Sequence, residues 1–126
     1  MRIIGLGLDL VEVARIHGLL EKWGPSFKER VFTSGERAYC ETHSQPAIHY
    51  AARFAAKEAV AKALGTGFTQ GVSWQDIEVR RDERGLPSVL LHGETLCLAE
   101  SLGISGWLLS LTHTETTAAA SAVAVG

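Results

Sequence analysis

The feature that most constrains the fold is an alanine-rich stretch, "ARFAAKEAVAKALGTG", at residues 52–67. Alanine has the highest helix propensity of all residues, so this stretch favours a helix that begins after Pro46 and runs to Leu64. Gly65 follows, and glycine is suited to the left-handed conformation that ends helices. Because alanine side chains are short, one face of this helix can pack closely against a sheet.

The N-terminal stretch "RIIGLGLDLVEV" alternates with period two and predicts a β-strand. Its even positions are leucine and isoleucine, which we expect to face the core. Its odd positions carry two glycines and a carboxylate, so this face leaves room for another group and is a candidate floor for a site. The even positions are Ile4, Leu6, Leu8 and Leu10, and the odd positions are Gly5, Gly7 and Asp9.

The rest of the chain predicts short helices, a hairpin and a final pair of strands. Residues 12–32 have helical spacing that Gly24 and Pro25 break into two helices. Thr33 and Glu36 can form a capping box at the start of a third helix. We expect a hairpin at residues 76–93, a helix at residues 94–103 and two strands within residues 106–125, where alternating valines favour a strand over the helix that alanine also permits.

Length and composition exclude several classes of protein. A chain of 126 residues with 46% hydrophobic and 21% charged residues most simply forms one globular domain, residues 1–126. A net charge of -2 argues against a nucleic-acid partner, and the apolar runs fall short of the roughly 18–20 residues of a membrane helix. Cys40 and Cys97 lack metal-like spacing and no secretion signal is evident, so we expect reduced thiols in the cytoplasm.

Four charges interrupt the alanine-rich helix. Arg53 and Lys57 are like charges four residues apart, and a nearby anion such as phosphate would relieve their repulsion. Glu58 and Lys62 lie on a neighbouring stripe, where they could form an ordinary surface ion pair. If the helix crosses the glycine-lined strand, Glu58 could instead meet Asp9. Two carboxylates with phosphate oxygens beside them suit Mg²⁺, although spacing alone does not decide between these interpretations.

Four segments of the chain resemble the holo-acyl-carrier-protein synthases, the short-chain group of 4'-phosphopantetheinyl transferases. The segments are "GLGLDLVEVARI", "FKERVFTSGE", "ARFAAKEAVAKALGTG" and "SLTHT", in the order and spacing of that family. The resemblance implies an α/β (α+β) fold, in which a small antiparallel sheet packs with a long alanine-rich helix and short helices. It also implies a trimer with active sites at the subunit interfaces.

The activity that this resemblance implies is transfer of 4'-phosphopantetheine from coenzyme A to a serine of an apo acyl carrier protein, with release of adenosine 3',5'-bisphosphate. Asp9 and Glu58 match the family's ligands of Mg²⁺, for which Mn²⁺ could substitute. Lys62 matches the family's lysine at the phosphate whose P–O bond is broken. Glu58, Asp9 or a water on the metal could take the serine proton. The implied contacts to coenzyme A are Arg53, Lys62, Gly65, Thr66, Gly67, His113 and Thr114.

Two further expectations concern the coenzyme. Residues 65–67 match a loop whose free amides can approach the ligand. At residues 85–87, "GLP" departs from a frequent glycine, basic residue, proline pattern. Leu86 replaces the base, which weakens the case for a nucleotide contact there.

Acyl carrier proteins are acidic, so the surface that receives one should combine basic side chains with an apolar anchor. Four residues of the N-terminal helices fit this description, and the alternative interpretation is ordinary solvated charges with a core phenylalanine. They are Arg15, which is the family's motif arginine, Lys22, Phe27 and Lys28. The other histidines show no zinc spacing, and we expect structural or surface roles for His17, His43, His49 and His92.

Two other functions stay open. A coenzyme A or nucleotide-binding module without transferase activity would bind the coenzyme but transfer nothing in the presence of magnesium. A Mg²⁺-dependent phosphohydrolase would release phosphate or phosphopantetheine from coenzyme A without any carrier, but the sequence offers no evident base for water. Within the transferase family, the carrier could serve fatty-acid synthesis or a polyketide assembly line.

Overall fold

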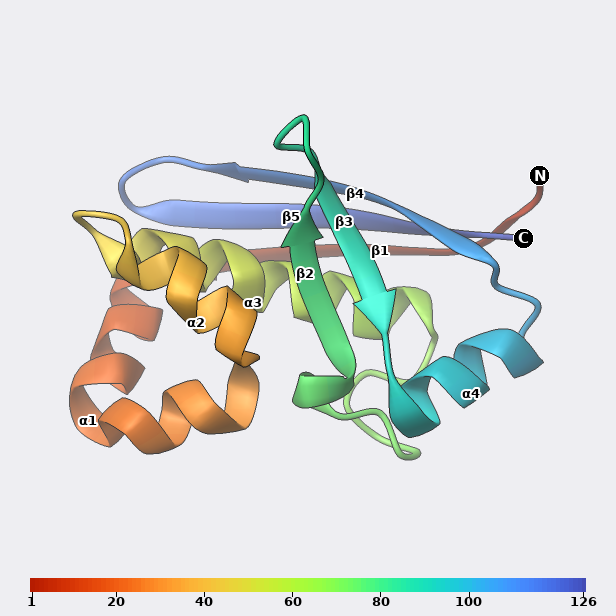
Figure 1. Ribbon diagram of the computed structural model, residues 1–126, viewed down its shortest axis with the longest axis horizontal. Coiled ribbons are helices and arrows are strands. Elements are labelled where there is room, and N and C mark those ends of the chain that lie inside the picture. Colours follow the sequence, from red (N-terminus) through yellow and green to blue (C-terminus); the bar gives the residue numbers. More distant parts are fainter.

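The alanine-rich helix α3 (Pro46–Ala63) lies along one face of a three-stranded antiparallel sheet, as Figure 1 shows. The structure is a computed structural model that describes residues 1–126. The helix ends as the sequence predicts, because Leu64 caps it and Gly65 follows with a φ of 82°. The sheet has the order β1–β5–β4, and its strands are β1 (Ile3–Glu12), β5 (Thr117–Val125) and β4 (Gly106–His113).

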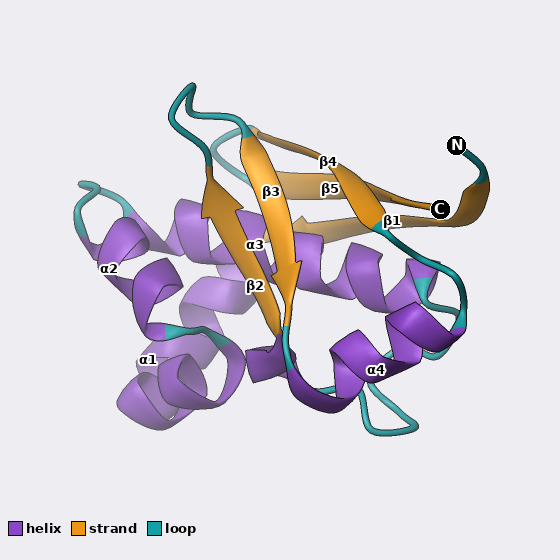
Figure 2. Ribbon diagram, turned by 45° about the vertical axis from the view of Figure 1, so that its right-hand side comes forward, coloured by secondary structure: helices purple, strands orange, loops and turns teal.

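Local sequence signals place the remaining elements. Helix α1 (Val13–Val31) is kinked at Gly24, whose φ of 48° is not helical, so the predicted break is confirmed. The predicted capping box between Thr33 and Glu36 opens α2 (Ser34–Glu41). Figure 2 shows the hairpin as a second, separate sheet beside α3. The elements not yet named are η1 (Trp74–Asp76), β2 (Ile77–Arg81), β3 (Pro87–Leu91) and α4 (Gly93–Ser101).

Helices and antiparallel strands together confirm the expected α+β class. The final strand β5 is confirmed as well, although its alanines would also suit a helix. It lies between two partner strands, so the backbone hydrogen bonds of the sheet outweigh the propensity of alanine for helix. None of the helices combines the length and the apolar character needed to cross a bilayer.

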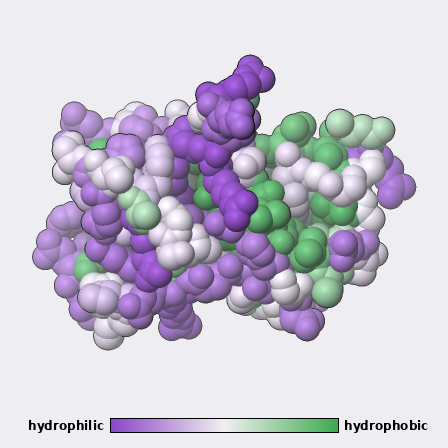
Figure 3. Space-filling view, viewed as in Figure 1, coloured by the Kyte–Doolittle hydropathy of each residue, from purple (hydrophilic) through white to green (hydrophobic).

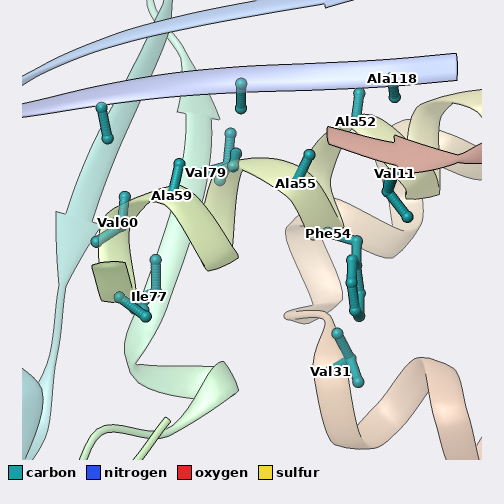
Figure 4. Close-up of a cluster of buried hydrophobic side chains, with 14 of the residues drawn as sticks. Val11, Val31, Ala52, Phe54, Ala55, Ala59, Val60, Ile77, Val79 and Ala118 are labelled. Carbon is teal, nitrogen blue, oxygen red and sulfur yellow. The ribbon is translucent and has the colours of Figure 1, made fainter. Parts of the chain in front are cut away.

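Glycines in β1 allow the backbone of α3 to lie directly on the strand. A Cβ atom added to Gly7 would be 1.7 Å from the carbonyl oxygen of Ala59, and one added to Gly5 would be 2.0 Å from that of Ala63. The sheet side of α3 is alanine, and Figure 4 shows Ala55 and Ala59 pointing toward β5. Small residues on both surfaces therefore bring helix and sheet into close contact.

The prediction that the leucine face of β1 forms the core is wrong. Leu6, Leu8 and Leu10 are 69%, 67% and 71% exposed, whereas the glycine face packs on α3. The reason is that only one face of the sheet is covered by a helix. Helix α3 packs on the glycine face, because its backbone can come closest to the strand there. The leucines are left on the outer face of the sheet.

Adding a methyl group at Gly7 is expected to destabilise the protein by about 1–3 kcal/mol or more, because the new atom collides with helix backbone that cannot move alone. Urea unfolding of Gly7→Ala measures this effect. Gly18→Ala is the matched control, because nothing lies within 4 Å of a Cβ atom at this position of α1. That substitution should be neutral or stabilising by up to about 1 kcal/mol. Equal effects at the two positions would contradict the close packing.

A buried ion pair links α3 to three other parts of the chain. Lys57 Nζ lies 2.7 Å from Glu36 Oε1, and both side chains are fully buried. Glu36 Oε2 also accepts a hydrogen bond from the amide of Val79 in β2, and Lys57 donates to the carbonyl oxygen of Trp74. The expectation that phosphate balances Lys57 is therefore wrong, because its anion is the carboxylate that also caps α2.

Candidate active site

Asp9 and Lys62 meet where β1 passes the C-terminal part of α3. The Lys62 ammonium lies 3.0 Å from Asp9 Oδ1 and donates a second hydrogen bond to the carbonyl oxygen of Leu8. The side chain of Asp9 is 15% exposed and that of Lys62 is 50% exposed, so the pair is open to solvent on one side. The surface ion pair considered for Glu58 and Lys62 does not form, because Lys62 bonds to the strand instead.

Glu58 lies on the same side of α3, one turn before Lys62. Burial and then the charge of Asp9 raise the pKa of the Glu58 carboxyl, while Lys62 and Arg15 act in the opposite direction. Because Glu58 is one turn of α3 from Lys62, which bonds to Asp9, the helix brings the two carboxylates near one another. No group of three or more histidine, cysteine, aspartate or glutamate side chains is arranged to hold a metal. Two carboxylates open to a phosphate ligand nevertheless fit Mg²⁺, which prefers one or two carboxylates plus phosphate oxygens.

An aromatic stack borders this carboxylate pair. The guanidinium of Arg15 lies over the ring of Phe54, 5.4 Å from its centroid. Phe54 stacks on Trp74 at 5.0 Å, and Trp74 stacks on Phe68 at 3.6 Å. Arg15, which the sequence suggested only for carrier docking, is also a neighbour of Glu58, and its positive charge partly opposes the rise in the pKa of the Glu58 carboxyl.

The loop after α3 is partly used to end the helix. The amides of Gly65 and Gly67 donate to the carbonyl oxygens of Lys62 and Ala61 at 2.9 and 3.1 Å. The expectation that amides of this loop are free is therefore wrong for these two glycines. The Thr66 hydroxyl donates to the carbonyl oxygen of Gly67. The loop begins three residues after Lys62, and Gly65 at its start is exposed.

Arg53 forms a second cluster with residues from other elements. Its side chain is only 3% exposed and has no carboxylate partner, and its guanidinium lies 4.0 Å from the centroid of the Tyr39 ring. Burial lowers the pKa of the Arg53 guanidinium. A cavity of about 300 Å³ opens beside it, and the lining includes His49, Arg81 and His113. A buried guanidinium without a carboxylate and facing a cavity is suited to bind an anion.

The two clusters lie on opposite flanks of α3. At about 100° per residue, Glu58 and Lys62 are about 140° and 180° around the helix from Arg53. Asp9 is on β1 and His113 is on β4, which are the two edges of the sheet. The fold therefore joins Asp9, Glu58 and Lys62 on one side and Arg53 and His113 on the other. Thr114 follows His113, and its hydroxyl accepts hydrogen bonds from the amides of Thr116 and Thr117 in the turn.

The residues expected to dock a carrier differ in their surroundings. Lys22 is exposed on α1, with its ammonium 5.1 Å from the centroid of the Trp23 ring. Phe27 is half-buried and packs against the core. Lys28 forms an ion pair with Glu41 at 2.7 Å. The exposed basic groups of this set are therefore Arg15 and Lys22.

Sequence reasoning missed part of the second cluster. The sequence suggested only structural or surface roles for His43 and His49, and gave no sign that their rings stack with centroids 3.7 Å apart. Arg81, from the separate hairpin, lines the cavity beside Arg53. The four-residue spacing of His49 and Arg53 on a predicted helix was a signal that could have placed the histidine there. No sequence signal links these residues to His43 or Arg81.

Comparisons with known proteins show the family of the chain. The 4'-phosphopantetheinyl transferase superfamily matches residues 5–121 of the chain. The holo-[acyl-carrier-protein] synthase of Solibacter usitatus is 50% identical over 112 residues, which are 89% of this chain and 90% of that protein. The one from Chlamydia trachomatis serovar L2 is 46% identical over 122 residues, which are 97% and 99% of the two chains.

Solved structures of similar proteins have the same fold. Holo-[acyl-carrier-protein] synthase from Neisseria meningitidis has a TM-score of 0.91 and 37% identity, covering 99% of this chain and 100% of that one. The Helicobacter pylori protein, solved in complex with coenzyme A, has a TM-score of 0.84 and 28% identity. This match covers 95% of this chain and 99% of that one.

Proposed function

The chain belongs to the 4'-phosphopantetheinyl transferase superfamily and is an enzyme of its holo-acyl-carrier-protein synthase group, and we propose that its active site joins half-sites from two subunits. The reaction moves 4'-phosphopantetheine from coenzyme A to a serine hydroxyl of an apo acyl carrier protein. The serine oxygen forms the new bond to phosphorus while the diphosphate P–O bond breaks, and adenosine 3',5'-bisphosphate leaves. The observation that carries the proposal is the cluster of Asp9, Glu58 and Lys62 beside an open surface.

In this proposal Asp9 and Glu58 hold Mg²⁺, or Mn²⁺ in its place, and face the diphosphate of coenzyme A. The bound ion would neutralise charge on the diphosphate oxygens. Lys62 supplies a further positive charge, because its long, half-exposed side chain can turn from Asp9 to an oxygen at the breaking bond. The loop of Gly65, Thr66 and Gly67 is assigned to the same half-site because it begins three residues after Lys62, at the end of the same helix.

The second half-site contains Arg53, His113 and Thr114, which we assign to the nucleotide end of coenzyme A. Because α3 separates the two half-sites within one chain, we propose that the Arg53 cluster of one subunit completes the Asp9 cluster of another. A trimer, as the family resemblance implies, would repeat this interface three times. We further propose that residues 1–126 act as one domain and that the enzyme works in the cytoplasm, where unpaired thiols such as Cys40 and Cys97 persist.

Exposed apolar surface supports the proposed assembly. Leu6, Leu8 and Leu10 of β1 and Leu108 of β4 are all more than half exposed on the sheet. Figure 3 shows apolar surface gathered on the half of the molecule that holds β4, α4 and both termini, whereas α1 and α2 are mostly polar. Apolar patches of this kind on a sheet commonly mark an interface with another chain.

Charge placed on this sheet face is expected to dissociate the assembly. In Leu8→Lys an ammonium replaces an apolar side chain, and burying it between subunits would be costly. Light scattering should show a monomer, and transfer should be lost because the half-sites no longer meet. Leu86→Lys is the control for light scattering alone and should stay assembled, because Leu86 is 49% exposed on the hairpin turn, away from the sheet. A fully active monomer of Leu8→Lys would refute the shared active site.

The transfer itself is tested in one reaction with the purified protein, coenzyme A, Mg²⁺ and several apo carriers, including fatty-acid and polyketide types. Mass spectrometry should show the added phosphopantetheine on the carrier serine, and the preferred carrier identifies the partner. Binding of coenzyme A without any mass increase would instead favour a binding module. Release of phosphate or phosphopantetheine without a carrier would favour a phosphohydrolase.

We assign carrier docking to α1, with Arg15 closest to the chemistry. Its guanidinium is near Glu58, so an acidic carrier bound there would hold its serine beside the carboxylate pair. Lys22 extends the basic surface, while Lys28 is shared with Glu41 and Phe27 supports the helix from the core side. This placement explains how docking and chemistry can share one side chain.

Arg15→Glu is expected to raise the KM for the carrier by about tenfold or more, with a smaller effect on kcat, because docking charge is reversed. Steady-state kinetics with varied carrier concentration measure both constants. Arg84→Glu, in the exposed turn between β2 and β3, is the charge-matched control and should leave KM unchanged. A loss confined to kcat at saturating carrier would show that Arg15 does not dock the carrier.

A further inference from the structure

Three imidazole rings gather beside the Arg53 cavity, although their residues lie on different segments. The rings of His43 and His49 stack at 3.7 Å between centroids with a tilt of 30°, and His113 approaches His49 edge-on at 5.7 Å. The Tyr39 ring lies 4.6 Å from His43 and 5.9 Å from His49. His49 and His113 line the cavity directly. His43 does not line it, but its ring stacks on that of His49.

The ionisable groups around His49 are almost all basic. Arg53 from α3, Arg81 from β2 and His113 from β4 face it together with His43, and no carboxylate lines this cavity. The nearest acidic residue of the adjoining cavity is Glu78, which already pairs with Arg80 at 3.2 Å and His92 at 2.9 Å. The cavity therefore has an unbalanced positive charge that an anion would neutralise.

We propose that His49, held by His43, is a phosphate-binding residue that takes up a proton when a phosphomonoester dianion enters the cavity of Arg53, Arg81 and His113. This inference rests on the proposed function, which assigns the diphosphate of coenzyme A to the Lys62 half-site. The remaining phosphate of coenzyme A is the monoester on its ribose. That group has the charge and size for this second cavity.

Electrostatics explain why the proton arrives with the ligand. Burial and then the charges of His43, Arg53, His113 and Arg81 lower the pKa of His49 to about 4, so its ring is neutral near pH 7. A dianion in the cavity opposes these positive charges and favours the imidazolium. Two stacked imidazoles do not readily carry a proton each, so the pair accepts one proton.

The sign of the pH dependence follows from this linkage. The pKa of His49 is about 4 without ligand and higher with it, so affinity is greatest below the free pKa and falls as pH rises through the bound pKa. Within that window the Kd rises by up to about tenfold per pH unit for one linked proton. The phosphate itself has a second pKa of about 6, and arginines favour its dianion, so titration of the ligand alone would release protons. Proton uptake therefore distinguishes the imidazole from the ligand.

Calorimetry of the purified, assembled protein tests the proposal without any requirement for turnover. Coenzyme A and 3'-dephospho-coenzyme A are titrated between pH 6 and pH 7 in buffers of different ionisation enthalpy, without metal. Coenzyme A should bind with net proton uptake, and the dephospho form should bind more weakly with less uptake. His49→Gln should remove most of the difference in uptake, and His17→Gln, an exposed histidine on α1, should preserve it.

A second measurement keeps the test independent of how the variant folds. In nitrogen-15 spectra of the unmodified protein, the imidazole signals of His49 should move toward the protonated form with coenzyme A and much less with the dephospho form. Equal proton uptake for both ligands, or uptake that persists in His49→Gln, would overturn the inference while transferase activity remained. Absence of both coenzyme A binding and transfer would overturn the proposed function as well.

Discussion

Glu58→Gln is expected to reduce the rate of transfer to the carrier by about 10³-fold or more at saturating substrates. The substitution keeps the shape of the side chain but removes one of the two carboxylates assigned to Mg²⁺, and loss of charge stabilisation at a phosphoryl centre costs several kcal/mol of barrier. Mass spectrometry of the carrier over time measures the rate. Added Mn²⁺ should not restore it, because the missing ligand is a charge.

Stability should respond to the same substitution in the opposite direction. Burial and Asp9 raise the pKa of Glu58 in the folded protein, so its charged form is disfavoured there relative to the unfolded chain. Removing that charge should leave the melting temperature unchanged or slightly higher near pH 7. Glu94→Gln, on the exposed first turn of α4, is the control and should retain full activity. Near-normal transfer by folded Glu58→Gln would refute the carboxylate site.

Breaking the buried ion pair is expected to give the largest loss of stability. Lys57→Met leaves Glu36 buried without its cation, and Glu36→Gln leaves Lys57 buried without its anion. Removing one partner of a buried pair typically costs about 3–5 kcal/mol, because the remaining charge has no compensation. The free energy of unfolding from urea titration measures this loss for each variant.

The chain supplies a matched control for this prediction. Lys28 and Glu41 have the same nitrogen–oxygen distance of 2.7 Å as Lys57 and Glu36, but their side chains are 33% and 46% exposed. Lys28→Met should cost only about 0–1 kcal/mol, as is typical of exposed pairs. If both lysine substitutions cost less than about 1 kcal/mol, burial does not determine the strength of these interactions.

Much of the secondary structure could be predicted because its signals are local. The glycine after α3, the capping box of Thr33 and Glu36, and the break at Gly24 each depend on residues a few positions apart. Such contacts form within one segment, so no knowledge of the rest of the fold is needed. The motif residues Asp9, Glu58 and Lys62 could be selected from the sequence for a related reason, because their family spacing is specific.

The sequence did not determine which face of a strand is buried or which distant side chains interact. Alternation in β1 showed that its two faces differ, but the backbone of α3 decided that the glycine face is buried and the leucine face exposed. The ion pair of Lys57 with Glu36 joins segments that are distant in the sequence. The ring contacts of His49 with His43 and His113 likewise depend on how the helices and strands pack. Helix and turn signals extend over a few residues of chain, whereas burial, ion pairing and the pKa of a side chain depend on which distant segments come to lie beside it.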